Sequence, residues 1–322
     1  MKYLIIYHDN CIDGITSATV AHKHLTEVQK ISHNDITYWP ASYDDDITPI
    51  IQALDVLSSP VLYIVDFSFS VEQLKKLDLH AHYVHLYDHH ASAFRNLLGA
   101  DYNVQPDSRE IFTIPMTNVA VTLDNSECGA SLCWRELIDR KGIFPRLISF
   151  VKDYDLWKFL LLDTKAINKF LRLQPKTIYC FSYLLETFER SAEVMEAAAT
   201  GEAIMEYEHQ LEASIISQGT SPITIGGMSG LAVNAPYALA SSIGNTLAKE
   251  SGTFGAVWSQ LAEGKVCFSL RSVGDNCDVS KIAELLGGGG HKNAAGFTMN
   301  SPDYDADKGM TIWHNLPVGK EE

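Results

Sequence analysis

The first ninety residues repeat one pattern, in which a short apolar run ends at acidic or histidine residues and a helical segment follows. Such runs cover residues 2–7, 61–65 and 83–87. Strands that alternate with helices form a parallel sheet whose carboxyl ends lie side by side, and ligands bind at that edge. The pattern therefore predicts an α/β domain with a parallel sheet and flanking helices. The candidate functional residues at or just after the strand ends are His8, Asp13, Asp66 and Asp88.

The third of these runs leads directly into the triplet Asp88-His89-His90. Successive side chains of an extended segment point to opposite sides, so a straight strand cannot aim all three at one ion. A turn at the strand end would let Asp88 and one histidine face the same point, while the other histidine contacts a substrate. The triplet is therefore a candidate metal site.

The second half of the chain has a different composition. Residues 118–139 predict a loop followed by a helix, and an apolar helix from Pro145 leads to Asp153 and Asp155. Residues 182–217 predict a long helix that is interrupted at Gly201, and shorter strands and helices follow Gly219. We therefore expect a catalytic domain over 1–185, a connecting helix over 186–218, and a smaller α/β domain over 219–322 that includes a peripheral tail after Met299.

Composition restricts the classes of function. The 322 residues carry 25 Lys and Arg against 40 Asp and Glu, a net charge of −15, which argues against binding to long duplex nucleic acid. The apolar run near the N-terminus is too short for a signal peptide, and no run approaches the 18 residues of a membrane span. Six cysteines without a CxxC pair indicate reduced thiols. We expect a cytoplasmic protein that has no membrane partner.

The segment GGGGHKNAAGF, residues 287–297, follows a predicted helix. Successive glycines allow close backbone approach and positive φ angles, which suit an anion-binding turn. The segment lies in the sequence SLRSVGDNCDVSKIAELLGGGGHKNAAGF. Together with HDNCIDG, VDFS, DHH and VKDYDLW, in that order along residues 1–300, it closely resembles the DHH phosphoesterase family with its DHH-associated C-terminal domain.

This resemblance implies phosphoester hydrolysis with two divalent cations, most often Mn²⁺ and alternatively Mg²⁺. The implied metal ligands are His8, Asp13, Asp66, Asp88, His90 and Asp153. The implied catalytic residues are Asp88 and His89. The residues implied to bind a substrate phosphate are Arg271, Gly288, Gly289, Gly290, His291 and Asn293.

Two positions leave alternatives. Asp153 matches the last acidic motif of the family better than Asp155, because it comes just after the apolar helix. Cys11 stands where the family usually has an aspartate. Asp9 could substitute for it, the first ion could bind more loosely, Cys11 could bind a softer metal, or Cys11 could be a buried structural residue.

The expected function is a metal-dependent phosphodiesterase that acts on short single-stranded oligonucleotides or small phosphorylated nucleotides, and exonuclease action is one form of this activity. Residues 219–322 contain seven Lys and Arg against ten Asp and Glu. They therefore lack the cationic groove expected for long single strands. The alternatives are a phosphoanhydride hydrolase resembling exopolyphosphatase or pyrophosphatase, and a nucleotide-binding module that has lost catalysis.

Overall fold

The computed structural model describes residues 1–43 and 45–300, so most of the predicted C-terminal tail lies outside the described residues. The chain divides into two compact units, Met1–Met205 and a second that begins at Glu206. Each unit contains its own six-stranded sheet with helices, which confirms the predicted α/β class. The unit boundary lies within the 29-residue helix α9 (Ser191–Gly219). The predicted limits 1–185, 186–218 and 219–322 stay a prediction.

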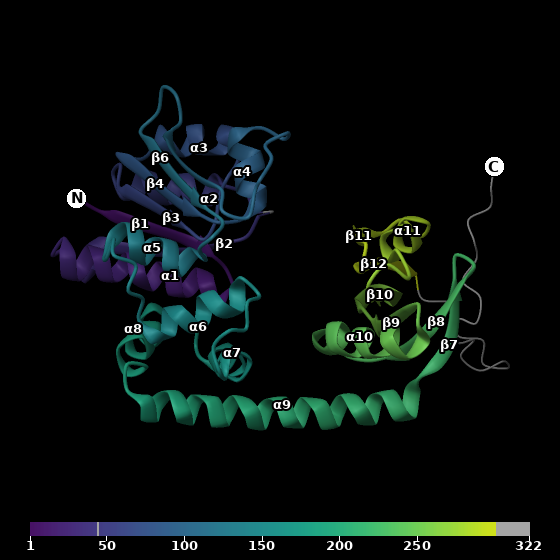
Figure 1. Ribbon diagram of the computed structural model, residues 1–322. Helices are drawn as coiled ribbons and strands as arrows, with labels where there is room; N and C mark the ends of the chain where they lie inside the picture. Colours follow the sequence, from purple (N-terminus) through teal and green to yellow (C-terminus); the bar gives the residue numbers. More distant parts are fainter. Residues whose placement is uncertain (44, 301–322) are drawn as a thin grey trace. The chain divides into compact units, whose positions relative to one another are not determined.

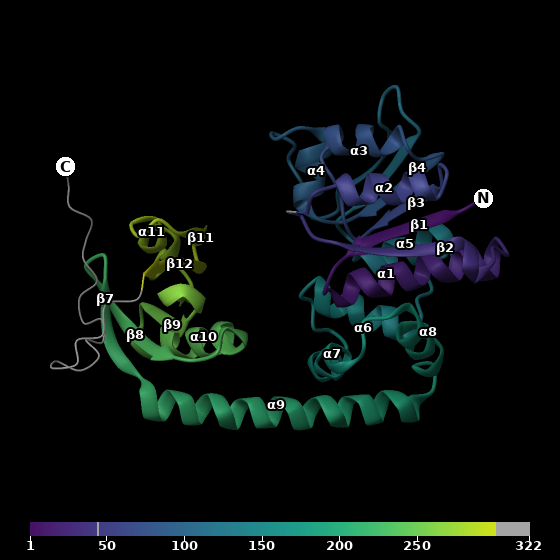
Figure 2. The same cartoon turned by 180° about the vertical axis from the view of Figure 1, so that it is seen from behind.

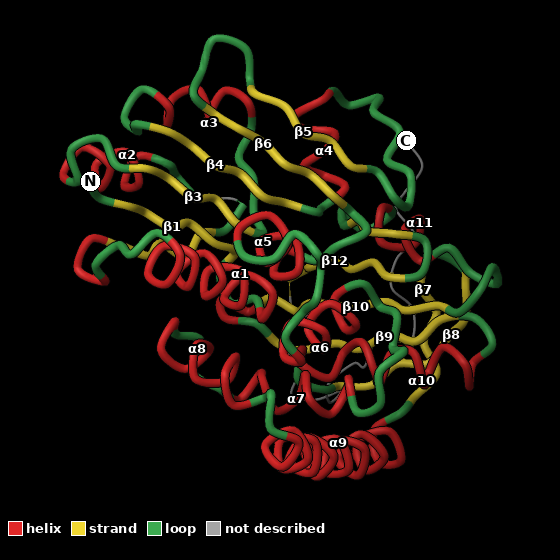
Figure 3. The backbone as a smooth tube through the Cα atoms, turned by 60° about the vertical axis from the view of Figure 1, so that its left-hand side comes forward, coloured by secondary structure: helices red, strands yellow, loops and turns green. Residues whose placement is uncertain are grey.

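The sheet of the first unit has the strand order β2-β1-β3-β4-β6-β5. Five strands are parallel, and β5 runs antiparallel to β6. Figure 3 shows β1, β3, β4 and β6 side by side. The strands are β1 (Tyr3–His8), β2 (Ile36–Ala41), β3 (Val61–Val65), β4 (Tyr83–Asp88), β5 (Arg109–Thr113) and β6 (Val119–Asp124).

Helices cover both faces of this sheet (Figures 1 and 2). On one face lie α1 (Ile12–Lys23) and α5 (Gly129–Leu137), and on the other lie α2 (Thr48–Val56), α3 (Val71–Asp78) and α4 (Ala91–Leu98). The chain leaves β1 toward β2 on one side and later returns to β3 on the other side. The strand order therefore reverses between β1 and β3, and doubly wound sheets bind ligands at such a point.

Strand β6 corrects the sequence prediction, which placed a loop before the helix in this region. Val119, Val121 and Leu123 alternate along β6 and are buried in the core beneath α3 and α4. The alternation is short and lies next to a turn, so its signal was weak without the partner strand β4. The prediction of a loop over this segment was wrong.

The remaining helices of the first unit are α6 (Arg146–Asp155), α7 (Thr164–Leu173), α8 (Ile178–Thr187) and the first part of α9. The predicted interruption at Gly201 was wrong, because α9 continues through this residue and the break falls between α8 and α9. Gly201 is buried, and a Cβ atom there would lie 1.9 Å from the carbonyl oxygen of Ala166 in α7. The glycine therefore permits close packing of α9 against α7.

The second unit has the strand order β11-β12-β10-β9-β8-β7. Helix α10 (Ala240–Ser251) and helix α11 (Val279–Glu284) pack with two separate core clusters of this sheet. Among the described residues, every helix is too short or too polar to cross a lipid bilayer. The strands are β7 (Ser221–Ile225), β8 (Met228–Asn234), β9 (Phe254–Gln260), β10 (Lys265–Ser272), β11 (Gly289–His291) and β12 (Ala294–Asn300).

The close contact between Gly201 of α9 and Ala166 of α7 predicts that adding a methyl group at residue 201 destabilises the fold. Gly201→Ala forces α9 away from α7, and overpacking of this kind costs about 1–3 kcal/mol, so the midpoint of thermal unfolding should fall by several degrees. The exposed Ala203 on the same helix supplies the control, since Ala203→Ser should leave the midpoint almost unchanged. A Gly201→Ala variant as stable as the parent would contradict the contact.

Candidate active site and metal centre

Potential metal ligands from several elements meet at the carboxyl edge of the first sheet. Because the ligand atoms within each group lie within 4.8 Å of one another and the groups share Asp66 or His89, the groups form one continuous cluster. The structure thus brings together five of the six predicted ligands, while their binding of metal remains a prediction. The groups are Asp66, Asp88, His89 and His90; His8, Cys11 and Asp66; and Asp13, His89 and Asp155.

Asp66 is the central member of this cluster. It directly follows β3, has a left-handed backbone with φ of 54°, and is fully buried. Among the described residues, no group donates a hydrogen bond to either carboxylate oxygen. The nearest nitrogens are Nε2 of His89, 3.1 Å from Oδ1, and Nδ1 of His8, 3.9 Å from Oδ2. A buried carboxylate without donors is costly, and a cation would satisfy it.

Three acids of the cluster, Asp13, Asp66 and Asp155, hold their protons more tightly than usual. Burial, opposed in part by His90 and reinforced by the charge of Asp88, raises the pKa of Asp66 to about 8. Burial and the charge of Asp66 raise the pKa of Asp13 to about 7, and burial and the charge of Asp13 raise that of Asp155 to about 6. Ionisation of all these acids would therefore place more negative charge in the cluster than the neighbouring described residues balance, and divalent cations fit such a site.

Asp88 is held by the backbone turn that follows β4. Its Oδ1 accepts hydrogen bonds from the backbone N–H groups of His89 and His90, at 2.7 and 3.2 Å, and approaches Nδ1 of His90 at 2.7 Å. Burial alone would raise the pKa of Asp88, but these bonds hold it below its ordinary range. With Nδ1–H directed at Asp88, Nε2 of a neutral His90 becomes the ligand atom.

Asp13, in the first turn of α1, is fixed by the amino end of α5. Its carboxylate accepts hydrogen bonds from the backbone N–H groups of Gly129 at 2.6 Å and Ala130 at 2.8 Å. A Cβ atom on Gly129 would lie 2.5 Å from the Cβ atom of Asp66. Gly129 therefore allows α5 to pack directly behind two acids of the cluster. The run of small residues at the start of α5 is the sequence signal for this role.

The structure places Asp155 in the cluster instead of Asp153. Asp155 Oδ2 lies 3.5 Å from Nε2 of His89. The buried Asp153 carboxylate instead accepts hydrogen bonds from the backbone N–H groups of Leu160 and Leu161 and from the hydroxyl of Thr164, at 2.9, 3.0 and 2.5 Å. Residues two apart on a helix point about 200° away from each other. We therefore replace Asp153 by Asp155 in the proposed ligand set.

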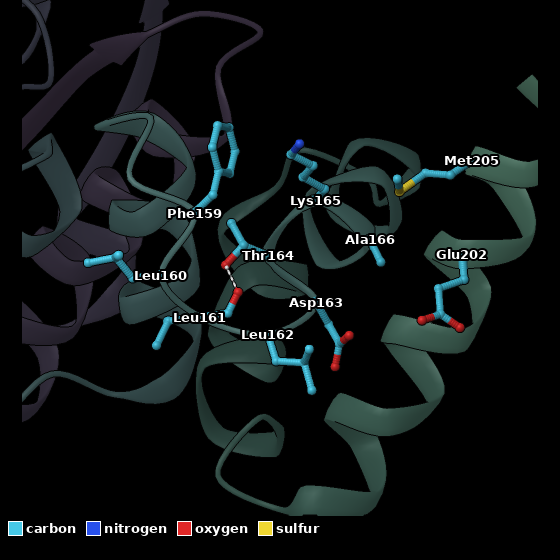
Figure 4. A pocket seen from close by; sticks show the side chains of 10 residues that line it. All are labelled: Phe159, Leu160, Leu161, Leu162, Asp163, Thr164, Lys165, Ala166, Glu202 and Met205. Carbon is cyan, nitrogen blue, oxygen red and sulfur yellow. Dashed lines mark hydrogen bonds between the residues drawn. The ribbon is translucent and has the colours of Figure 1, made fainter. Parts of the chain in front are cut away.

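The loop that Asp153 holds borders a cavity of about 560 Å³ (Figure 4). Thr164 also donates a hydrogen bond to the carbonyl oxygen of Leu161, drawn as a dashed line in that view. The cavity is lined by the continuous segment from Phe159 to Ala166, together with Glu202 and Met205 of α9. Asp153 therefore has a structural role in shaping the chain between α6 and α7.

Asp124 shows how this fold neutralises an acid at a strand end. It ends β6 and is 2% exposed, like the acids of the cluster. Its carboxylate, however, accepts hydrogen bonds from Ser126 and Arg135. Burial opposes ionisation, but these partners lower the pKa of Asp124. Among the described residues, no arginine pairs with Asp66 or Asp88 in this way. These two acids of the candidate site therefore differ from Asp124, whose charge an arginine balances.

Cys11 lies at the start of α1, and its sulfur is within 4.8 Å of ligand atoms of His8 and Asp66. Burial and the charges of Asp66 and Asp13 raise the pKa of its thiol. Asp9 belongs to none of the three ligand groups found among the described residues. The geometry therefore favours Cys11 over Asp9 as the neighbour of the first ion.

A second cavity, of about 590 Å³, adjoins the cluster in the first unit. Its lining includes His8, Asp13 and Asp155 from the cluster. A cavity of this size accommodates a small ligand. The candidate metal centre is therefore accessible to a substrate from this side.

The residues predicted to bind a phosphate lie in the second unit. Ala294 of β12 pairs with Arg271 of β10 on one side and with His291 of β11 on the other. Directly paired residues share a face of a sheet, so Arg271 and His291 lie on one face with a small residue between them. The Nη2 group of Arg271 donates to the hydroxyl of Ser241 at 2.9 Å.

The glycine segment and Asn293 have structural contacts of their own. A Cβ atom on Gly288 would lie 2.2 Å from the carbonyl oxygen of Gly296, while Gly289 and Gly290 are exposed in β11. The side-chain amide of Asn293 donates to the hydroxyl of Ser272 and to the carbonyl oxygen of Gly274. These bonds fix the turn that directly follows Arg271 at the end of β10. Asn293 therefore has a structural role next to Arg271.

The two acids of α6 provide a matched test of this geometry. Asp155→Asn should weaken Mn²⁺ binding at least tenfold, about the lower end of the loss caused by altering groups around bound metals, with little loss of thermal stability. Asp153→Asn should lower the unfolding temperature, because it weakens three hydrogen bonds, and should change Mn²⁺ affinity much less. Calorimetric titration and thermal unfolding measure both effects. The proposed ligand set would be contradicted if Asp153→Asn weakened Mn²⁺ binding and Asp155→Asn lowered only the unfolding temperature.

The stability of the metal-free protein should fall as the pH rises. The folded pKa of Asp66 lies above its ordinary value of 3.8, so the unfolded chain releases this proton first, and stability is lost between that pH and about 8. Burial lowers the pKa of His90, but bonding to Asp88 raises it to about 10, which acts in the same direction above its ordinary value. Mn²⁺ should therefore raise the unfolding temperature more at pH 8 than at pH 6. An equal rise at both values would oppose this reading.

Comparison with known proteins gives one family model and relatives along nearly the full chain. Residues 233–308 match the DHHA1 domain. The uncharacterized protein R106 of Acanthamoeba polyphaga mimivirus is 26% identical, over 92% of this chain and 67% of that protein. Oligoribonuclease NrnB of Bacillus subtilis is 22% identical, over 93% of this chain and 74% of NrnB.

A similar solved structure is the pGpG-specific phosphodiesterase PggH from Vibrio cholerae, with a TM-score of 0.48 and 12% identity over 93% of this chain and 94% of PggH. The DHHA1 match and the similarity to NrnB agree with the order of motifs along the chain, from the strand-end acids to the glycine segment. The C-terminal unit carries a DHHA1 domain, and along nearly its full length the chain is similar to an oligoribonuclease and resembles the DHH phosphoesterases in the order of its motifs.

Proposed function

We propose that this protein is a divalent-metal-dependent phosphodiesterase that hydrolyses short single-stranded oligonucleotides or small nucleotides. The observation that carries the proposal is the buried Asp66 at the centre of the cluster, because neither of its carboxylate oxygens has a hydrogen-bond donor among the described residues. The name of NrnB, an oligoribonuclease, supports the substrate class. Mn²⁺ is the proposed metal and Mg²⁺ the alternative, because both accept carboxylate and imidazole ligands.

The proposed ligands fall into two overlapping sets. His8, Asp66 and Asp88 are proposed to hold one ion, with Cys11 beside it, and the other acids and His90 to hold the second. Two such cations would lower the pKa of a water molecule and neutralise charge on the phosphoryl oxygens. The second set is Asp13, Asp66, His90 and Asp155.

His89 is proposed to act on the substrate. Its Nε2 is buried, has no hydrogen-bond partner among the described residues, and lies within 3.6 Å of oxygens of Asp13, Asp66 and Asp155. A nitrogen at this point can contact an oxygen of a phosphoryl group that is held between the acids. Asp88 is proposed to orient the imidazole, because it fixes the backbone N–H of His89.

The second unit is proposed to bind a terminal phosphate of the substrate. Arg271 supplies a planar pair of N–H donors that suits a phosphate, and His291 lies on the same face of the sheet. The exposed Gly289 and Gly290 leave room for close approach of a ligand to the backbone. The proposed location is the cytoplasm, and the six cysteines form no disulfide within the described residues.

A substrate panel tests the proposal directly. The protein with Mn²⁺ should release mononucleotides from oligonucleotides of two to five residues, and Asp88→Ala should abolish release, because it removes a ligand and the partner of His90. Polyphosphate, cyclic dinucleotides and 3′-phosphoadenosine 5′-phosphate complete the panel, each with Mn²⁺ and with Mg²⁺. Phosphate release from polyphosphate alone would favour the phosphoanhydride hydrolase. Tight nucleotide binding without any turnover would favour a binding module.

A further inference from the structure

The cavity beside the metal cluster is lined by cationic as well as acidic side chains. Besides the acids of the cluster, Arg172 and Lys176 line it, together with Asn168 and Tyr154. Arg172 belongs to α7, and Lys176 follows that helix. These cations come from the first unit, far along the chain from the residues proposed to bind a phosphate in the second unit. They match none of the motifs that identified the family.

The guanidinium of Arg172 is oriented from within the protein. Its Nε donates a hydrogen bond of 2.9 Å to Oδ1 of Asn168, and Asn168 is 6% exposed. Because one turn of α7 separates the two residues, the helix itself fixes this contact. The bond engages the Nε edge and leaves the terminal Nη groups available for a ligand.

Acidic partners are missing at both cations. The described residues show no ion pair to Arg172 or to Lys176, although the chain carries 40 acidic residues. Some other cations of the first unit, such as Arg109, Arg135 and Lys152, do pair with carboxylates. Both cations line the cavity that acids of the metal cluster also line, and neither has an acidic partner among the described residues, so both are available to an anionic ligand in that cavity.

We propose that Arg172 and Lys176 form a subsite for a second, non-scissile phosphate of the substrate. This inference rests on the proposed phosphodiesterase function, in which the scissile phosphate lies at the metal cluster. The Nη groups of Arg172 offer paired donors, and the ammonium of Lys176 adds a point charge. Asn168 is a positioning residue for Arg172. Asp9 also lines the cavity, and its carboxylate accepts the backbone N–H of Asn10.

The subsite defines the substrate class more narrowly. A dinucleotide with hydroxyl groups at both ends has only its scissile phosphate, so it leaves Arg172 and Lys176 without a partner. A dinucleotide with a terminal phosphate, or a longer oligonucleotide, supplies the second anion. The preferred substrates are therefore short nucleotides that carry at least two phosphates, one at the metal cluster and one at the cationic end of the cavity.

Binding without turnover provides the first test. The probes are three dinucleotides with a hydrolysis-resistant phosphorothioate linkage, which carry a 5′-phosphate, a 3′-phosphate or no terminal phosphate. Calorimetry on the full chain in metal-free buffer should show at least one phosphorylated probe binding about tenfold more tightly than the unphosphorylated one, the gain expected of a charge-assisted contact. The double variant Arg172→Gln/Lys176→Gln should lose that difference.

Two control variants identify the source of the preference. Lys165→Gln removes one positive charge from the same helix, but Lys165 lines the other cavity, so this variant should keep the preference. Arg271→Gln tests the phosphate site proposed in the second unit. The inference is overturned if the parent shows no preference, if Lys165→Gln abolishes it, or if Arg271→Gln abolishes it while the double variant retains it.

Kinetics with Mn²⁺ provide the second test. The double variant should raise KM for the preferred phosphorylated dinucleotide about tenfold and leave KM for bis(4-nitrophenyl) phosphate, which has a single phosphate, unchanged. An equal effect on both substrates would contradict a specific subsite. If the parent hydrolyses no phosphodiester, the proposed function fails, whereas the binding measurement still decides whether the two cations hold a phosphate.

Discussion

Electrostatic repulsion among buried carboxylates is the constraint around which the first unit is built. The buried Asp13, Asp66 and Asp88 and the more exposed Asp155 lie at one edge of a parallel sheet, and the described residues supply too few cations to balance them. The reversal of strand order between β1 and β3 creates the opening in which they meet. Backbone amides of α5 hold Asp13, and a glycine permits α5 to approach Asp66. The fold thus maintains an arrangement of charge that is unfavourable until cations bind.

Asp124 and Asp66 show that position in the sequence pattern does not decide function. Each is a buried aspartate at the carboxyl end of a strand in the same sheet. Asp124 is paired with an arginine and a serine, whereas Asp66 has only imidazoles nearby. An aspartate with an internal cation is balanced within the fold, whereas a buried aspartate without one either keeps its proton or is a candidate ligand for an external cation. This difference separates a structural acid from a candidate ligand.

The sequence allowed prediction of the features that depend on local periodicity. Strands that end at His8, Asp66 and Asp88 could be placed because each is an apolar run that stops at a polar residue. The order of these segments predicted a parallel sheet with flanking helices, and parallel pairing then required their ends to be neighbours. The glycine segment was likewise recognisable, because a helix and an apolar segment surround it.

Features that depend on tertiary contacts escaped prediction. Asp153 and Asp155 differ only in which way they face on α6, and this depends on where the helix packs. In the sequence, a glycine that ends a helix looks the same as a glycine that lets two helices pack closely. For Gly201 only its contact with the carbonyl oxygen of Ala166 shows that the second role applies. Arg172 and Lys176 look like ordinary surface cations in sequence. Their significance comes from the cavity that they share with acids more than a hundred residues away.

Helix α7 both packs against α9 and carries Arg172 of the cavity beside the metal cluster. Its Ala166 receives the close approach of α9 at Gly201, and two residues later Asn168 orients the guanidinium of Arg172. A small translation or rotation of α7 would therefore move Arg172, which lines the cavity, relative to the acids of the cluster. The packing of α9 against α7 therefore influences the position of Arg172 in the cavity. Substitutions at this contact would shift Arg172 without touching any residue of the metal cluster.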